Sequence, residues 1–413
     1  MNRLFRIVLS LMVFLPVIFS CKKDNTSNSD EEKPQDEQVP EQPVNPDAAN
    51  CYLVTKPGSF SFPTYKGNSF IPVGDVASVE ILWESYGTGT APYEHSLISY
   101  LAYSSGNEED QAGTISCTVP SPMKNGNAVV AAKDENGKIL WSWHIWLCKD
   151  YDPDETAQSY YNDAGVMMDR NLGATSATPG DVGALGLLYQ WGRKDPFLGS
   201  SSISASTQAA STGEWSKTWT NETIGTIEYT IEHPMTFIAS GLQNGDWLYG
   251  KSEWYRTYST DFTRWGAKKT IYDPCPKGWR VPDEAEKNED NNYENIWSKT
   301  LGSFETFTWG YDLENLGINF YHKFGDKDPI WYPLAGYIHG TSGQQGVGLL
   351  LNVKNYGFWW TCGGNTSLYI EHYNAQHIRP SWTTWSRHCY GCSVRCQRDA
   401  LPEAQSDEQS PEN

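Results

Sequence analysis

The sequence has little positive charge for its size. Its 413 residues include 31 Lys and Arg against 50 Asp and Glu, which gives a formal net charge of −19. A protein that binds nucleic acid needs a basic face that neutralises phosphates, so this balance argues against nucleic acid as a partner. The negative charge suits a surface protein in a salty medium, because it keeps molecules apart.

Long apolar runs are also scarce. The one near-continuous run covers residues 7–19 and follows Arg3 and Arg6. A short apolar run behind positive charge at the N-terminus is typical of an export signal and too short for a membrane helix. Residues 1–20 are therefore predicted to be a signal peptide. No second run of about 18 apolar residues follows, so we expect no other segment to cross a membrane.

Several catalytic and metal-binding signatures are missing. The chain has no Gly-x-Ser-x-Gly and no His-Glu-x-x-His. Asp150, Asp152 and Asp154 alternate in an oxygen-rich turn, but the spacing and glycine of an EF-hand are absent. We expect a solvated turn there, with calcium as the alternative, and we expect no metal or cofactor in this protein.

Residues 22–50 lack aromatic side chains and have almost no aliphatic ones. Such a segment cannot bury enough apolar surface to fold, so we interpret it as a tether that its prolines keep extended. The polar residues 401–413 are expected to fray in the same way.

The segment Ile18-Phe19-Ser20-Cys21 resembles a bacterial lipobox, with Ile at the usual Leu position. The resemblance implies that Cys21 is acylated and anchors the protein in a membrane, since each buried acyl CH2 contributes about 0.8 kcal/mol. The alternative is an ordinary secretory signal that contains a cysteine. Lys23-Asp24 and the acidic run 30–32 are similar to the surface-export signals of Bacteroidetes lipoproteins, which implies an outer-membrane, surface-exposed lipoprotein.

Eight further cysteines fall into two odd-numbered groups. Three precede residue 150 and five follow residue 270. Exported proteins can form disulfides, and an odd count leaves at least one thiol unpaired in each group unless a bridge joins them. The cysteines are Cys51, Cys117, Cys148, Cys275, Cys362, Cys389, Cys392 and Cys396.

Residues 51–149 follow a pattern of short strands. Two apolar runs surround Glu135-Asn136-Gly137, which predicts a β-hairpin. In the second run, 139–147, both alternating faces are largely apolar, so we expect a central strand that is covered on both sides. About 100 residues of this kind predict a β-sandwich domain that ends near residue 150.

Residues 150–400 differ, with many Trp, Tyr and Gly residues and few long helical periodicities. Helical spacing predicts a helix over 181–197, capped by Asp181, and a second helix or helical turn over 282–301. From Trp331 onward the sequence predicts strands. The expected fold class is therefore α+β and β-rich.

The stretch CPKGWRVPDEAE, residues 275–286, combines structural signals. A turn leads to Trp279, which we place in the core, and Asp283 with Glu286 forms a capping box. The alternative, a nucleophilic Cys275, needs a base, and no His is near it in the sequence.

Four motifs together resemble a known family. They occur in the order found in the Fibrobacter succinogenes major paralogous domain of Bacteroidetes surface lipoproteins, although Lys287 stands where that family has Trp. The resemblance implies a C-type-lectin-like fold over 150–400, with a partner module ahead of it, and a disulfide between Cys275 and Cys396. The motifs are VMMDRNLGA (166–174), GLLYQWGRKDPF (186–197), CPKGWRVPDEAE (275–286) and GCSVRCQRD (391–399).

With Cys275 and Cys396 paired, we expect a second disulfide between Cys362 and Cys389 and a buried Cys392. The alternative is a zinc site built on Cys389-x-x-Cys392, but no second Cys-x-x-Cys accompanies it. The further zinc ligands in that case would be chosen from Cys362, His372, His377 and His388.

The chain contains 18 Trp and 24 Tyr. Exposed aromatic rings stack on sugars and mark binding sites, although a loop-rich fold also uses aromatics to fill its core. We interpret Trp359, Trp360, Trp382 and Trp385 as candidate ligand-binding residues. Adjacent Trp359 and Trp360 should point to opposite faces of a strand, which makes one of them the better exposed candidate.

The expected function is non-enzymatic: binding or adhesion at the cell surface, to a glycan or a protein. One alternative is an enzyme on the same fold, similar to formylglycine-generating enzymes, because a fold does not fix a function. Another alternative is a structural subunit of a surface assembly.

Overall fold

The structure is a computed structural model of the whole chain. It describes residues 43–107, 112–160, 164–242, 245–250, 264–283, 296–297, 309–321, 329–342, 346–363, 367–372, 378–381 and 387–399. Cys21, Trp382, Trp385 and most of the helix expected over 282–301 lie outside these residues. In the parts of the chain that are described, no helix is long and apolar enough to cross a membrane.

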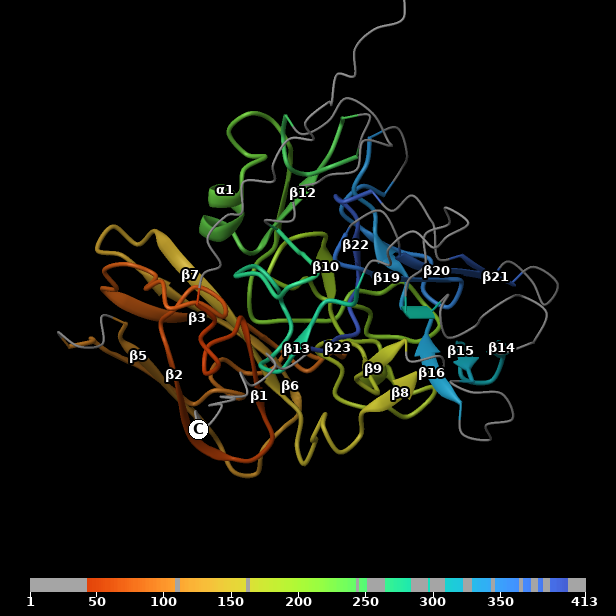
Figure 1. Cartoon of the computed structure of the whole chain (residues 1–413), viewed down its shortest axis with the longest axis horizontal. Coiled ribbons are helices and arrows are strands. Elements are labelled where there is room, and N and C mark those ends of the chain that lie inside the picture. The colour runs from red at the N-terminus through yellow and green to blue at the C-terminus, as the bar shows by residue number, and fades with distance from the viewer. Residues whose placement is uncertain are drawn as a thin grey trace, which may run out of the picture. The chain divides into compact units, whose positions relative to one another are not determined.

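Two sheets form the first half of the described chain (Figure 1). Both sheets contribute to one core, in which Phe62, Ile115, Val130 and Trp143 are buried. The first sheet has the order β1-β7-β6-β3, with β1 Cys51–Val54, β7 Ile139–Leu147, β6 Gly126–Lys133 and β3 Ser78–Ser85. The second has the order β2-β5-β4, with β2 Gly58–Pro63, β5 Thr114–Val119 and β4 Tyr100–Ser104.

The hairpin predicted around residues 135–137 is confirmed as β6 and β7, which pair antiparallel. Asp134 fixes the turn, because its carboxylate accepts hydrogen bonds from the backbone N–H groups of Asn136 and Lys138, both at 2.9 Å. Gly137 adopts φ 79°, which suits glycine. The expectation that this strand is covered on both sides is also confirmed: Trp143 packs between the two sheets, whereas Trp146 packs against the second half of the chain.

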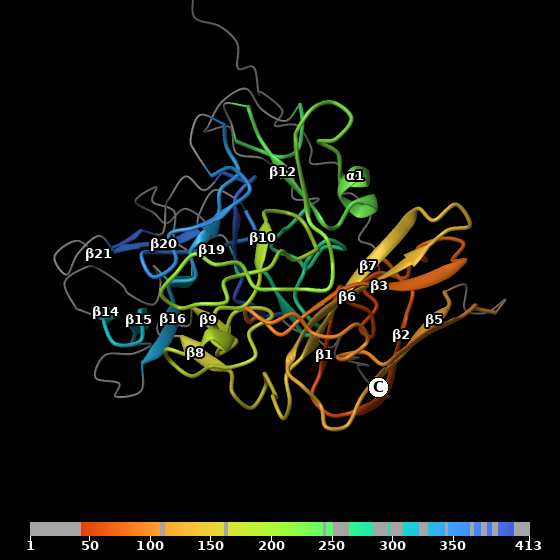
Figure 2. The ribbon, with the colours of Figure 1, turned by 180° about the vertical axis from the view of Figure 1, so that it is seen from behind.

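The second half contains several small sheets (Figures 1 and 2). The largest follows the order β18-β17-β22-β19-β20-β21 and has β10 beside β22. Its strands are β18 Leu350–Leu351, β17 Tyr337–Ile338, β22 Gly391–Ser393, β19 Tyr356–Trp360, β20 Ser367–His372, β21 Ile378–Ser381 and β10 Leu188–Gln190.

Three smaller sheets complete the second half. One has the order β13-β23-β9-β8, with β13 Trp279–Arg280, β23 Gln397–Arg398, β9 Gly165–Met167 and β8 Gln158–Tyr160. Another joins β14 Trp309–Asp312, β15 Gly317–Phe320 and β16 Ile330–Pro333. The last pairs β11 Ser216–Trp219 with β12 Thr236–Ala239.

Helix is almost absent from the described residues. They contain the short α-helix α1 Ile227–Glu232, the 3-10 turn η1 Val182–Ala184 and a helical piece at residues 296–297, within the segment where the second helix was expected. The structure is therefore β-rich, as the sequence indicated.

The helix predicted over 181–197 is wrong beyond its first turn. Asp181 does cap η1, since its carboxylate accepts a hydrogen bond from Gly183 N at 2.9 Å. Gly186 and Gly192 then adopt φ 73° and 81°, a left-handed conformation that ends helical winding. Residues 188–190 instead form β10, which pairs with β22. Tertiary strand pairing has overridden the local helical spacing.

One large core joins the two halves. It buries Trp83 and Trp146 from the first half together with Trp191, Trp279 and Trp360 from the second. Burying a large aromatic side chain contributes roughly 2–3 kcal/mol, so this shared core ties the first-half sheets firmly to the second half.

His144 on β7 is fully buried in this region and makes the stability of the protein depend on pH. Its Nε2 lies 2.9 Å from Asn127 Oδ1, and burial lowers its pKa to about 3. In the unfolded chain the pKa is about 6.5, so the unfolded state takes up a proton that the folded state refuses. Stability should therefore fall as pH drops from 6.5 towards 3.

We expect His144 to reduce the free energy of unfolding by about 2 kcal/mol between pH 7.5 and pH 5. Urea unfolding at several pH values measures this, with His144→Gln as the control, because Gln can still donate to Asn127 and does not titrate. Other groups titrate equally in both proteins. Parallel pH profiles for the variant and the native protein would show that His144 does not carry the effect.

Candidate functional site

The two candidate tryptophans on β19, Trp359 and Trp360, are both completely buried. They do point to opposite faces of the strand: Trp359 Nε1 donates to Asn171 Oδ1 at 2.8 Å, and Trp360 Nε1 donates to the Tyr189 carbonyl at 2.7 Å. The prediction that one of them is exposed is wrong, because the sheet is covered on both faces and each indole N–H is satisfied internally. Neither ring is available to a ligand.

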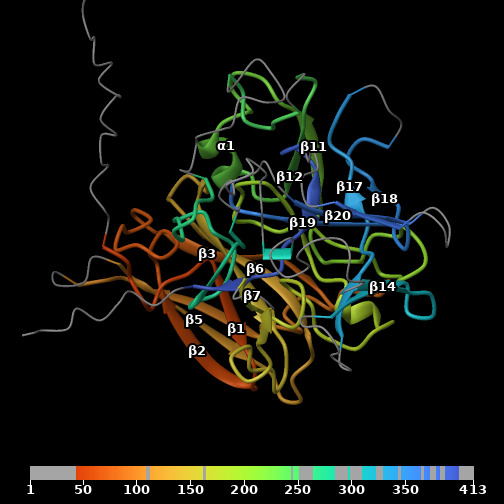
Figure 3. The same cartoon turned by 45° about the vertical axis from the view of Figure 1, so that its right-hand side comes forward.

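The same sheet carries a different group of aromatic side chains, which we call the tyrosine platform. Its four tyrosines are half-buried and surround Phe358, which is 7% exposed. They come from β17, β19, β20 and the residue before β22, strands that Figures 1 and 3 place next to one another. The platform consists of Tyr337, Tyr356, Phe358, Tyr369 and Tyr390.

Ring contacts make the platform continuous. Tyr337 lies in its middle, with ring centroids 5.0 Å from Phe358, 5.3 Å from Tyr390 and 6.2 Å from Tyr356. Tyr369 extends it, at 4.6 Å from Phe358 and 5.8 Å from Tyr356. Aromatic pairs at these separations attract one another by roughly 0.5–1.5 kcal/mol each, so the rings hold each other in place.

Three hydroxyl groups of the platform have polar neighbours. Tyr356 Oη donates to Glu371 Oε1 at 2.8 Å, on the strand opposite. Tyr337 Oη accepts from the Asn352 side chain at 3.5 Å.

Tyr390 Oη lies 3.4 Å from the hydroxyl of Thr341. Burial raises the pKa of Tyr390, so its hydroxyl stays protonated at neutral pH. The platform therefore combines half-buried aromatic rings with hydroxyl groups, and the Glu371 carboxylate lies beside one of them.

The sequence prediction did not include the platform because it chose tryptophans, and no tyrosines, as candidate ligand-binding residues. The alternation Tyr356-x-Phe358-x-Trp360 predicts that three aromatic rings share one strand face, and this signal was available. Tyr337 and Tyr390 could not be added from sequence alone, since only the sheet order brings β17 and β22 beside β19.

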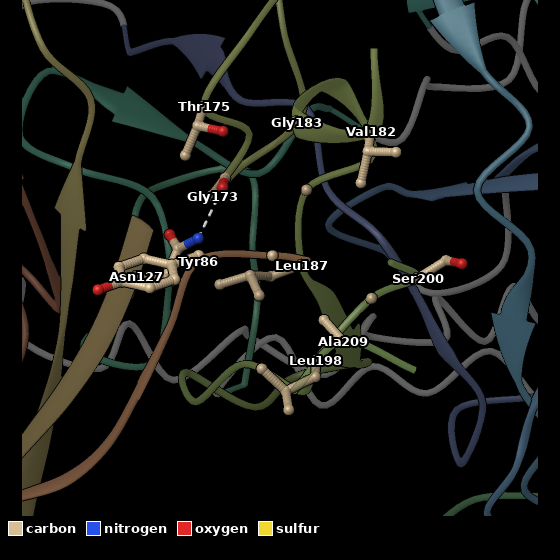
Figure 4. A pocket seen from close by; sticks show the side chains of 13 residues that line it. Tyr86, Asn127, Gly173, Thr175, Val182, Gly183, Leu187, Leu198, Ser200 and Ala209 are labelled. Atoms are coloured by element: carbon tan, nitrogen blue, oxygen red, sulfur yellow. Dashed lines mark hydrogen bonds between the residues drawn. The ribbon is translucent and has the colours of Figure 1, made fainter. Parts of the chain in front are cut away.

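A small pocket lies elsewhere in the molecule, between residues of the two halves (Figure 4). Its cavity volume is only about 10 Å³, and it is lined by residues of both halves, including Tyr86, Leu187 and Ser200. Asn127 is already engaged there, because its Nδ2 donates to the Gly173 carbonyl at 2.9 Å. Ligand pockets usually enclose 300–1,000 Å³, so this one is far too small for an organic ligand and has room for about one water molecule. It is a weaker candidate than the platform.

A buried ion pair joins β7 to the second half. Lys194 Nζ lies 2.9 and 2.8 Å from the two carboxylate oxygens of Asp195, and it also donates to Ser142 Oγ at 2.6 Å. Burial lowers the pKa of Lys194, and Asp195 opposes that shift. The side chains of Lys194 and Asp195 are only 3% and 4% exposed, so no substrate reaches this Ser-Lys-Asp group. Its role is structural.

A second buried charge cluster surrounds Trp191. Arg264 forms two hydrogen bonds with Asp246, at 3.0 and 2.8 Å, and His388 Nδ1 lies 2.9 Å from the same carboxylate. Burial alone would raise the pKa of Asp246, but Arg264 and His388 hold it well below its usual range. The Trp191 ring stacks on His388 at 4.4 Å and contacts the Arg264 guanidinium at 4.3 Å. In this arrangement the buried charges neutralise one another and pack against the Trp191 ring.

The stretch 275–283 has a structural role. A disulfide joins Cys275 to Cys396, the pair that the family resemblance implied. Asp273 accepts hydrogen bonds from the N–H groups of Cys275 and Val281 at 2.8 and 2.9 Å, and Trp279 is buried. These contacts tie the middle of the second half to its last strand.

The carboxylate of Asp283 forms two hydrogen bonds with Arg280, at 2.6 and 2.7 Å. The capping box expected for Asp283 needs Glu286, which lies outside the described residues.

The predicted disulfide between Cys362 and Cys389 is absent, and this prediction is wrong. Cys362 packs with Trp360 in the core that joins the two halves, whereas Cys389 packs with Trp247 in a separate cluster. Different cores hold the two side chains, so no bond joins them. Cys392 is buried, and burial raises the pKa of both Cys389 and Cys392.

Within the described ranges, no cluster of His, Cys, Asp and Glu is arranged to hold a metal ion. In the acidic turn, Asp152 accepts a hydrogen bond from Asp154 N at 2.9 Å, and the Asp154 carboxylate lies 2.9 Å from the guanidinium of Arg398.

Comparison of the sequence with models of known protein families gives no match, and comparison with curated proteins gives none either.

Proposed function

We propose that this protein is a surface lipoprotein, anchored at Cys21, that binds a carbohydrate over the tyrosine platform without catalysing a reaction. In this proposal residues 51–149 form a β-sandwich domain and residues 150–400 a C-type-lectin-like domain. Two sheets around one core support the first assignment, and the order of the four sequence motifs supports the second. The anchor and the outer-membrane location rest on the sequence alone.

The observation that carries the proposal is the platform itself. Four half-buried tyrosines lie side by side in ring contact, and each combines an apolar ring with a hydroxyl group. Binding sites combine a mainly apolar surface with a few placed polar groups, and tyrosine supplies both. A sugar ring has the matching surface, since one face carries C–H groups and its edge carries hydroxyls. The net charge of −19 favours such an uncharged ligand over a polyanion.

The state of the thiols supports a binding function over the enzyme alternative. A thiol acts as a nucleophile in its thiolate form. Burial raises the pKa of Cys389 and Cys392, the Cys-x-x-Cys pair, and both are 0% exposed. These two cysteines are therefore poor nucleophiles, which weakens a role similar to formylglycine generation.

Replacing platform tyrosines should weaken glycan binding strongly. A tyrosine at the centre of a binding surface typically contributes 2 kcal/mol or more, so Tyr356→Leu with Tyr369→Leu should weaken binding by about 30-fold or more. Leucine keeps most of the apolar packing but removes the flat ring. A glycan array probed with the native ectodomain and with this variant measures the loss.

Two controls make the result specific. Tyr93→Leu with Tyr100→Leu removes two exposed tyrosines of the first half, which are 84% and 59% exposed, and should leave glycan binding unchanged. Tyr369→Phe keeps the ring and should retain most of the affinity. Each variant is first checked for an unchanged unfolding midpoint. An ectodomain that binds no glycan would contradict the proposal, and capture of a protein ligand by the same platform would replace it.

A further inference from the structure

Three exposed apolar side chains lie together near the start of the described chain. Val44 is 57% exposed, Phe70 is 49% exposed and Ile71 is 40% exposed. An antiparallel bridge pairs Val44 with Ser69, so Val44 lies beside the segment that carries the other two. Single exposed apolar residues are ordinary on a protein surface, whereas contiguous ones mark contact sites. We call Val44, Phe70 and Ile71 the Phe70 patch.

The loop that carries the patch is held in one conformation. Lys66 N donates to the Ile71 carbonyl at 2.9 Å, and Tyr65 forms an antiparallel bridge with Pro72. The ring centroids of Tyr65 and Phe70 are 5.9 Å apart in an edge-to-face contact. These contacts close the loop and support Phe70 while leaving it exposed. A loop that is already ordered loses little conformational entropy when it binds.

The loop is also tied to a distant part of the chain. Asn68 Nδ2 donates to the Lys269 carbonyl at 3.1 Å. Gly67 adopts φ 55° and lies so close to Ile271 that a Cβ at this position would clash with the Ile271 carbonyl. The apolar side chains are therefore presented by a loop that is fixed to the rest of the fold.

The patch lies where the predicted tether joins the folded part. The described chain begins at residue 43, next to Val44, and residues 22–42 lead back to Cys21. A tether of this length spans at most about 70 Å when fully extended. A site joined to an anchored tether meets the membrane at a high effective concentration, so contacts that are weak between free molecules become populated.

The charges near the patch indicate which kind of lipid surface it fits. Lys66 is the one charged residue in the loop sequence 65–72. Asp47, three residues after Val44, forms an exposed ion pair with Lys277 at 2.8 Å, so these two charges offset one another. The net charge of −19 of the whole chain would repel an anionic surface. The patch therefore fits a zwitterionic lipid surface better than an anionic one.

We infer that the Phe70 patch docks on a zwitterionic lipid surface, with Phe70 and Ile71 inserted at the boundary between headgroups and acyl chains. This inference rests on the membrane anchor in the proposed function and goes beyond its ligand binding. Apolar side chains gain free energy when they leave water for that boundary. Docking would hold the folded part against the bilayer instead of leaving it free on its tether.

The test uses the chain from residue 22 onward with an N-terminal His tag, held on phosphatidylcholine vesicles that contain a nickel-chelating lipid. This link replaces the acyl chains, so the result does not depend on acylation of Cys21. An environment-sensitive fluorophore is attached at Val44→Cys, because the free thiols of the described residues are buried. Its emission should rise by about threefold or more on the vesicles, and lipid that carries a quencher should reverse the rise.

Phe70→Ser with Ile71→Ser should reduce that rise by about fivefold or more, because the substitutions remove the apolar surface that leaves water. The same fluorophore at Tyr93→Cys is the matched control. Tyr93 is 84% exposed and lies outside the patch, so its emission should not rise. Each variant is first checked for an unchanged unfolding midpoint.

Emission at position 44 that does not respond to vesicles, or a rise that survives the double substitution, would overturn the docking role. A rise that needs no vesicles and grows with protein concentration would also overturn it and would assign the patch to a second copy of this chain. Labelling with a fatty acid tests the anchor separately. An unlabelled Cys21 would overturn the proposed anchor, and the vesicle result would still decide whether the patch binds lipid.

Discussion

Reduction of the Cys275–Cys396 disulfide is expected to lower the free energy of unfolding by about 4–5 kcal/mol. The two cysteines are 121 residues apart, and their bond connects the stretch around Trp279 to the last strand. A cross-link over a loop of this length removes a large part of the entropy of the unfolded chain. The loss is large because a whole domain is typically stable by only 5–15 kcal/mol.

Chemical unfolding with and without a reductant measures this effect without changing any side chain. Cys275→Ala with Cys396→Ala should show the same low stability and no response to the reductant. Cys392→Ala is the matched control, since it truncates a buried cysteine of the same core that forms no disulfide. It should remain responsive to the reductant. Identical unfolding curves for the oxidised and reduced native protein would refute the stabilising role of the bond.

Replacing Lys194 by methionine is expected to cost about 3–5 kcal/mol. The substitution leaves Asp195 charged and buried with only the Ser142 hydroxyl, 2.6 Å away, to solvate it. Removing one partner of a buried ion pair is costly because the desolvated charge that remains has no counterion. The substitution should also weaken the contact between the two halves, since Ser142 is on β7.

The matched variant Lys194→Met with Asp195→Asn separates this charge effect from a packing effect. It removes both charges but keeps a polar group beside Ser142, so it should recover most of the lost stability. Urea unfolding of the native protein and the two variants provides the comparison. If the double variant is as unstable as Lys194→Met, the loss comes from packing and the ion pair explains none of it.

Strand patterns in the first half could be predicted from the sequence because they depend on local signals. Alternation over 139–147 and the turn at Gly137 both operate within a few residues. The helix expected over 181–197 failed for the opposite reason. Its helical spacing is a local signal, but β10 forms because residues 188–190 find a partner strand about 200 residues away.

The burial of Trp359 and Trp360 could not be predicted from the sequence either. Trp359 and Trp360 resemble a binding pair when read along one strand, yet contacts from distant residues cover both rings. The half-buried tyrosines lie at the edge of the core because their hydroxyls are compatible with polar neighbours such as Glu371 and Thr341. Which rings reach that rim depends on the order of the strands in the sheet.

The central claim, that the ligand lies on the tyrosine platform, is tested most directly by NMR of the ectodomain with labelled tyrosine rings. A neutral oligosaccharide is titrated in, and the ring signals are assigned by single Tyr→Phe variants. The account predicts shifts confined to Tyr337, Tyr356, Tyr369 and Tyr390. Shifts of Tyr93 or Tyr100 in the first half, with the platform signals unmoved, would contradict it.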